Sequence, residues 1–74
     1  MKHQTINHEL QVGENNIWVP TIAEMYRPAF ELLKKDQITA AIQTAAEIRV
    51  SNYGTINSAR IQFRVITTTT TWIE

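Results

Sequence analysis

Alternation between two sets of side chains from Thr5 to Val12 restricts the fold of this chain more than any other feature of its sequence. One set is Ile6, His8, Leu10 and Val12, and the other is Thr5, Asn7, Glu9 and Gln11. Successive side chains of a strand point to opposite faces, so the mainly apolar set lies on one face and the polar set on the other. The segment is therefore predicted to be a half-buried β-strand.

A turn and a second strand are predicted to follow. Residues 13–16, Gly-Glu-Asn-Asn, are typical of a turn, and residues 17–19, Ile-Trp-Val, are typical of a short returning strand. Pro20 ends that strand because proline has no N–H to donate to a sheet. The N-terminal part of the chain is thus predicted to form an antiparallel hairpin.

A helix is predicted from Ile22 to about Lys35. Its start matches a capping box, in which the Thr21 hydroxyl accepts an N–H of the first turn and Glu24 reaches back to the N–H of Thr21. Apolar residues then recur at helical spacing: Ile22, Met25, Tyr26, Ala29, Leu32 and Leu33. Pro28 lies inside this pattern and leaves the carbonyl of Glu24 without a donor. We expect either a kinked helix or a first turn followed by a helix that restarts at Pro28.

Residues 38–50 fit two different structures. Their four alanines favour a helix, which Asp36 could cap. Every second residue from Ile38 to Val50 is, however, apolar or threonine, and helical spacing gives a weaker apolar stripe. We predict a strand, with a second helix over about residues 37–46 as the alternative.

The C-terminal segment, residues 59–73, also alternates, and it includes the β-branched run Thr67–Thr71. A four-residue loop at 54–57 would join it to the preceding strand as a hairpin. That register sets Ile48 opposite Phe63 on the inner face and Glu47 opposite Arg64 on the outer face. The predicted fold is α+β, with an antiparallel sheet in ββαββ order and one helix packed on its inner face.

Size and charge limit the class of protein. The 74 residues fit one small domain, residues 1–74, and the lack of cysteine excludes disulfides and thiolate metal sites and fits a reducing cytoplasm. The sequence shows no secretion signal and no apolar run long enough to span a membrane. Seven basic residues balance seven acidic ones, so no net charge draws the chain to nucleic acid or anionic lipid. We expect a cytoplasmic protein without a membrane partner.

No combination of residues predicts catalysis or cofactor binding. His3 and His8 are five apart on one predicted strand, so they point to opposite faces and cannot share a metal ion. His8 is expected to be partly buried and hydrogen-bonded. No motif joins a serine or threonine to His8 as a nucleophile, and the isolated Gly13 and Gly54 form no phosphate-binding loop. We expect no catalytic residue, no metal, no cofactor and no enzymatic activity.

The uncovered face of the predicted sheet is the candidate binding surface. In the predicted register it carries an apolar stretch formed by Ala41, Ala45, Ile66 and Trp72. Tyr53 and Arg64 would orient a partner on it. The alternative for Trp72 is that it folds against the first hairpin and completes the core. The uncharged run Thr67–Thr71 lacks the charges that protect a sheet edge, and it could pair with a second copy to form a homodimer.

These features favour a non-enzymatic protein-interaction module. Regulators and inhibitors encoded by phages and plasmids are often this small and motif-poor, and such a module would occlude or bridge a macromolecular partner. One alternative is a nucleic-acid-binding protein that uses the arginines of the predicted C-terminal hairpin, and another is a self-assembling structural protein. The predicted partner-binding residues are Trp72, Ile66, Tyr53, Arg64, Arg60 and Arg49.

Overall fold

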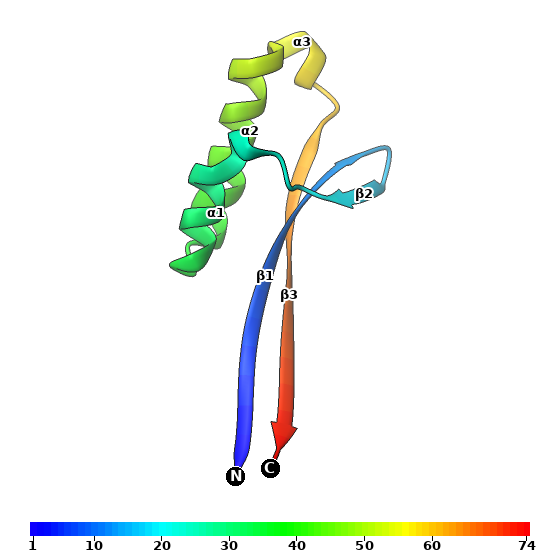
Figure 1. The fold of residues 1–74 in the computed structure, drawn as a ribbon. Helices are drawn as coiled ribbons and strands as arrows, with labels where there is room; N and C mark the ends of the chain where they lie inside the picture. The colour runs from blue at the N-terminus through cyan, green and yellow to red at the C-terminus, as the bar shows by residue number, and fades with distance from the viewer.

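The computed structural model describes all residues, 1–74, and has an α+β fold (Figure 1). Three strands, β1 (Lys2–Glu14), β2 (Ile17–Pro20) and β3 (Gln62–Ile73), form one antiparallel sheet in the order β2-β1-β3. Between β2 and β3 the chain forms the 3₁₀ turn η1 (Glu24–Tyr26) and the helices α1 (Arg27–Lys34), α2 (Ile38–Tyr53) and α3 (Thr55–Ser58). The predicted α+β class is confirmed. No helix combines the length and the apolar character that a membrane crossing requires.

The predicted N-terminal hairpin is confirmed as β1 and β2. Its turn is shorter than predicted, because Gly13 and Glu14 belong to β1 and only Asn15 and Asn16 connect the strands. Both asparagines have positive φ angles, 54° and 64°. A two-residue turn with positive φ at both positions matches the twist of the flanking strands, and asparagine tolerates this conformation better than most residues.

The predicted helix Ile22–Lys35 is present as two pieces, η1 followed by α1, and the predicted restart near Pro28 is confirmed. Pro28 is the second residue of α1, where its missing N–H would have no acceptor within the helix. The predicted capping box is wrong. Thr21 is buried, its hydroxyl makes no hydrogen bond, and its backbone N–H donates to the carbonyl of Leu10 at 2.9 Å. The chain is held to β1 there before the first helical turn begins.

The segment predicted as a strand over residues 38–50 is the helix α2, and it extends to Tyr53. The alternative of a second helix is therefore correct. Ala41 and Ala45 lie one turn apart and are both fully buried, so the small side chains allow α2 to pack closely in the core. The predicted strand register required both alanines on the outer face, and that prediction is wrong. Gly54 follows the last residue of α2 as its cap: its φ of 86° suits glycine, and its N–H donates to the carbonyl of Val50.

The predicted C-terminal hairpin is consequently absent, and β3 pairs with β1 instead. Phe63 lies opposite Val12 and Arg64 opposite Gln11, while α3 occupies most of the predicted loop. The threonine run Thr67–Thr71 is part of a strand, as predicted. The two longest strands of the fold therefore come from opposite ends of the chain.

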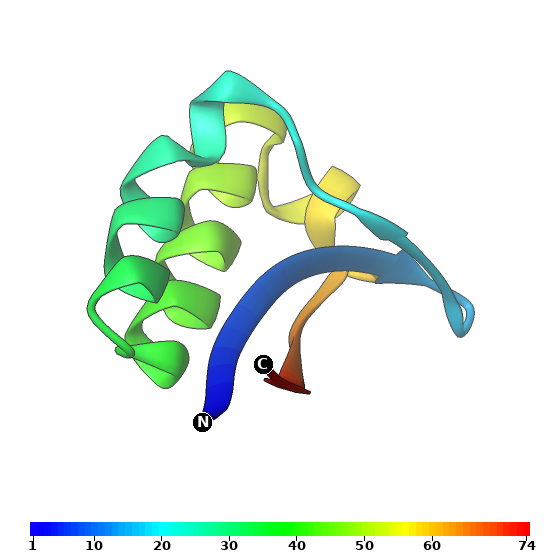
Figure 2. The same cartoon turned by 60° about the horizontal axis from the view of Figure 1, so that its bottom comes forward.

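The helices pack on one face of the sheet, here called the inner face (Figure 2). This face is formed by even-numbered residues of β1 and odd-numbered residues of β3. The core beneath the helices contains Leu10, Tyr26, Ala29, Leu33, Ala41 and Ala45. Phe63 and Val65 pack against it from β3, and the Phe63 ring meets Tyr26 edge to face with centroids 5.4 Å apart.

The helices cover only part of the long β1–β3 ribbon (Figure 1). The covered half pairs residues 8–13 with 62–67, and the projecting half pairs residues 2–7 with 68–73. The molecule measures 52 × 24 × 19 Å, and its radius of gyration is 14.3 Å. A compact domain of this length would have a radius of gyration of about 11 Å. The projecting half accounts for this elongation.

Candidate contact surface

The sheet face opposite the helices, here called the outer face, is open along the whole ribbon (Figure 2). It is formed by odd-numbered residues of β1 and even-numbered residues of β3. From the β1–β2 turn to the chain ends it presents Trp18, Arg64, Ile66, Thr68, Thr70 and Trp72. An indole therefore stands near each end of the face, with an arginine, an isoleucine and threonines between them.

Trp72 lies on the projecting half, opposite His3 of β1. Its ring stacks on the His3 imidazole with centroids 5.3 Å apart and planes 18° apart, and 43% of the residue is exposed. His3 Nε2 is 3.1 Å from Glu74 Oε1 but lies outside hydrogen-bonding geometry. Trp72 does not join the core under the helices. It packs against β1 by one ring face and leaves a large apolar surface open to solvent.

Trp18 and Arg64 organise the other end of the outer face. A side chain at Gly13 would place its Cβ within 2.5 Å of the Trp18 ring, so the indole lies directly over the glycine backbone. Arg64 holds its guanidinium 4.3 Å from the centroid of that ring and donates from Nε to Gln11 Oε1 at 2.8 Å. Gln11 in turn donates to Glu9. Arg64 is oriented by these contacts, and its terminal nitrogens stay available on the surface.

The β3 edge of the sheet is unpaired over its full length. Glu74 and Met1 exchange two hydrogen bonds, from Glu74 N to Met1 O at 3.2 Å and from Met1 N to Glu74 O at 2.6 Å. Hydrogen-bonded pairs alternate along an antiparallel ladder, so even-numbered residues of β3 direct their backbone groups toward β1. The odd-numbered residues, from Phe63 to Ile73, direct theirs away from the sheet. No charged side chain interrupts this edge between Val65 and Ile73.

The predicted partner-binding residues fall into separate groups. The structure brings Trp72, Ile66 and Arg64 together on the outer face of β3. Tyr53 and Arg49 lie instead in the last turns of α2, where the Arg49 guanidinium is 4.0 Å from the centroid of the Tyr53 ring. Arg60 follows α3. The shared arginine face of a hairpin that the sequence predicted does not exist, because Arg49 is on a helix and Glu47 does not pair with Arg64.

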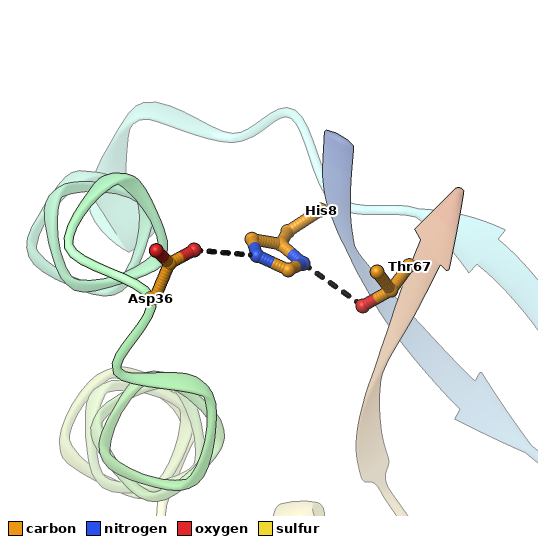
Figure 3. Close-up of polar contacts among 3 residues, drawn as sticks. All are labelled: His8, Asp36 and Thr67. Atoms are coloured by element: carbon orange, nitrogen blue, oxygen red, sulfur yellow. Dashed lines mark hydrogen bonds and ion pairs between the residues drawn. The ribbon is translucent and has the colours of Figure 1, made fainter. Parts of the chain in front are cut away.

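His8 links the ribbon to the helices at the boundary between the two halves (Figure 3). Its Nε2 is 2.8 Å from Asp36 Oδ1, and its Nδ1 is 2.8 Å from Thr67 Oγ1. The carboxylate requires a proton on Nε2, so in a neutral ring Nδ1 accepts from the Thr67 hydroxyl. The predictions that His8 is partly buried and hydrogen-bonded, and that His3 points to the other face, are confirmed.

Asp36 was missed as the partner of His8 because the contact depends on a turn. Asp36 connects α1 to α2 with a φ of 58°, a conformation that aspartate tolerates better than most residues. A histidine between a hydroxyl and a carboxylate is also an arrangement that can activate a nucleophile. Here the carboxylate side chain is 82% exposed, and Thr67 is an exposed residue of the β3 edge. The array joins the helix layer to the ribbon, and solvent weakens its electrostatics.

A hollow of about 660 Å³ lies beside this array, between β1 and α1. Its apolar lining is Ile6, Leu10, Ile22, Phe30 and Leu33, and its polar lining includes His8, Asp36, Thr21 and Lys34. No group of three or more histidine, aspartate or glutamate side chains comes together in the fold. The lining also includes Ile6 and Asn7 of the projecting half, where the inner face of the ribbon loses its helical cover (Figure 1).

Comparison of the chain with protein-family models, curated proteins and solved structures gives no significant match. The function is therefore argued from the surfaces described above.

Proposed function

We propose that this chain is a non-enzymatic protein-interaction module and that the outer face and the free β3 edge of the β1–β3 ribbon are its contact element. The observation that carries the proposal is the exposure of apolar groups on a sheet face that no helix covers: 43% of Trp72, in the projecting half, and 38% of Ile66, in the covered half, are open to solvent on the outer face. An aromatic ring and an aliphatic side chain exposed on one sheet face are typical of the desolvated centre of an interface.

The ribbon offers two modes of contact with a polypeptide. The unpaired β3 edge can accept a strand through backbone hydrogen bonds, and the outer face can bury side chains against Trp72 and Ile66. Arg64, fixed by Gln11 and Trp18, adds an oriented cation at the end of the same face. A module of this kind would act by occluding or bridging its partner, as small regulators and inhibitors do.

Trp72→Ala tests the proposal most directly. The tagged wild-type chain is first used to capture a partner from a lysate, and the complex is then reconstituted with the identified, purified partner. We expect Trp72→Ala to lose this binding. The free energy of unfolding should change by no more than about 1 kcal/mol, because Trp72 lies outside the core and part of its surface is already hydrated. Calorimetry with the purified partner and thermal unfolding of the variant alone provide the two measurements.

Ile22→Ala is the matched control. Ile22 is 89% exposed and apolar, but it precedes η1 and lines the hollow between β1 and α1, on the helix side of the sheet and away from the outer face. We expect this variant to bind normally. Loss of binding with Ile22→Ala but not with Trp72→Ala would place the contact on the helix side and contradict the proposal. A large fall in unfolding temperature with Trp72→Ala would show that this side chain stabilises the fold and is not reserved for contact.

The same experiment separates protein from nucleic acid as the partner. Arg49 lies on α2, Arg60 follows α3, and Arg64 lies on β3. The hairpin face that motivated the nucleic-acid alternative is therefore absent. We expect capture to survive nuclease treatment and the double variant Arg49→Glu/Arg60→Glu. Capture that disappears with nuclease, or that weakens steeply with salt, would overturn the assignment of a protein partner.

A further inference from the structure

We infer that the partner of the β3 edge is β3 of a second copy of this chain, paired antiparallel about a twofold axis that passes through Thr69. This inference rests on the proposed function of the ribbon as a contact element, and it names the polypeptide that the edge receives. Each copy would contribute three strands to a continuous six-stranded sheet in which the two β3 strands are the central pair.

The backbone limits the registers that such a pair can take. Odd-numbered residues of β3 direct their N–H and C=O groups outward, so only odd-numbered residues can form the hydrogen-bonded pairs with a second strand. Placing the axis at Thr69 meets this condition. It pairs Thr69 with itself, Thr67 with Thr71 of the second copy, and Val65 with Ile73 of the second copy. All outward groups from Val65 to Ile73 then find partners.

The side chains favour this register over its neighbours. With the axis at Thr69, Ile66 lies beside Trp72 of the second copy on the outer face, and Val65 lies beside Ile73 on the inner face. Arg64 lies opposite Glu74, so the two ends of the strand pair carry opposite charges. The terminal nitrogens of Arg64 and one carboxylate oxygen of Glu74 are free for this contact. An axis at Thr70 would instead set Ile66 against Glu74 and Trp72 against a threonine.

The β3 edge suits self-pairing better than the free part of the β1 edge. Threonines occupy all positions nearest the axis, so two copies meet there without like charges or a change of polarity. The β1 edge is open only up to the segment that β2 and the Thr21 N–H occupy, and Lys2 stands at its end. Edge strands of soluble proteins are usually blocked by a charge, a proline or a bulge, and β3 has none of these from Val65 to Ile73.

The exposed area of the chain agrees with a missing partner. Its accessible surface is 5484 Å². A compact monomer of 8.5 kDa exposes roughly 4,700 Å², so this chain exposes about 800 Å² more than expected. That excess is close to the ~800 Å² that each partner buries in an interface of standard size. Because each copy uses its β3 edge once, the twofold pairing closes as a dimer and does not extend into a fibre.

Thr69→Pro and Gln4→Pro form a matched pair of tests. Residue 69 points its N–H outward at the β3 edge, and residue 4 points its N–H outward at the β1 edge, so neither proline removes a hydrogen bond of the β1–β3 ladder. Light scattering on the purified chain should give twice the 8.5 kDa mass for the wild type and for Gln4→Pro, and a single mass for Thr69→Pro. Circular dichroism should confirm that both variants keep their helices.

Introduced cysteines test the register independently, since the chain has none of its own. Thr68 and Thr70 of the second copy would form a non-hydrogen-bonded pair, with Cα atoms about 4.5 Å apart and within reach of a disulfide. Mixing Thr68→Cys and Thr70→Cys chains should give cross-linked heterodimers faster than either variant gives homodimers. Fastest cross-linking of Thr68→Cys alone would place the axis at Thr68 and overturn the register.

A wild-type mass of one chain at millimolar concentration would overturn the inference, as would a dimer that survives Thr69→Pro and is lost with Gln4→Pro. These measurements use only the purified chain. They therefore fail or succeed separately from the Trp72→Ala binding test, in which the chain is presented to other proteins.

Discussion

The two halves of the β1–β3 ribbon have the same backbone pairing but different surroundings. In the covered half Leu10 is 2% exposed, and the helices seal the inner face around it. In the projecting half Ile6 occupies the equivalent inner position of β1 and is 58% exposed. Backbone hydrogen bonds alone make a two-stranded ribbon only marginally stable in water, and a packed face supplies the rest. The comparison shows that the helices bury the inner face of the covered half and leave the inner face of the projecting half exposed.

The largest expected effect is the difference in stability between a substitution at Leu10, in the covered half, and one at Ile6, in the projecting half. Leu10→Ala should lower the free energy of unfolding by about 3 kcal/mol, because it opens a cavity in the core. Ile6→Ala removes a similar side chain from the same face of the same strand, and it should cost about 0.5 kcal/mol or less. Urea unfolding of both variants at low protein concentration measures the difference.

A chain of this size has only a few kcal/mol of net stability, so Leu10→Ala should leave a substantial unfolded fraction without denaturant. Equal losses for Leu10→Ala and Ile6→Ala would show that the projecting half is packed within the monomer, contrary to the exposure described above.

The second prediction concerns the outer face near the β1–β2 turn, where the Trp18 ring lies over Gly13. Gly13→Ala should cost about 1–3 kcal/mol, because the new methyl group would meet the Trp18 ring at 2.5 Å and displace the indole and the Arg64 guanidinium above it. Tryptophan fluorescence should change together with stability.

Gly54→Ala serves as the comparison for that variant. Nothing lies within 4 Å of a Cβ at residue 54, but its φ of 86° disfavours any residue with a Cβ. The loss in free energy of unfolding for Gly54→Ala should come from backbone strain alone, and the tryptophan emission should not change. Unchanged emission in Gly13→Ala would mean that Trp18 does not rest on the glycine.

The smallest expected effect is at the boundary between the halves, where Asp36 holds His8. Asp36→Gly keeps the positive φ accessible and removes the carboxylate, and it should lower the free energy of unfolding by less than about 1 kcal/mol because the pair is largely exposed. Asp36→Asn retains an acceptor oxygen at the same place and should cost less. Chemical shifts of the His8 ring nitrogens report the loss of the contact directly, and identical shifts in Asp36→Gly and the wild type would contradict it.

Local patterns predicted the elements whose side chains fit only one period, either that of a strand or that of a helix. The alternation from Thr5 to Val12 gave β1, the β-branched threonines gave β3, and the helical spacing after Ile22 gave η1 and α1 with the restart at Pro28. The prediction that Trp72 and Ile66 lie on the uncovered face rested on their alternation in the last strand, and this position is unchanged by the different sheet partner because the alternation itself is unchanged. The positions of His3 on the outer face and of His8 on the inner face followed from the same two-residue period.

Residues 38–53 show where local pattern was insufficient. Their apolar residues fit a strand period, whereas alanine favours a helix, and nothing within the segment ranks the two. The structure places Ala41 and Ala45 at the tightest point of the core, where only small side chains fit. With that segment helical, β3 has no neighbour in sequence to pair with, and it pairs with β1 across the whole chain.

The sequence by itself therefore determined the class of the fold, the two long strands, the first hairpin and the open, uncharged character of the threonine edge, because these depend on periods and compositions within single segments. Only the tertiary structure decided that α2 is a helix, that β3 lies against β1, that Asp36 reaches His8, and that Arg49 and Arg60 part from Arg64. Each of these depends on which distant segments bury their apolar faces together, and that is a property of the packed chain and not of any one segment.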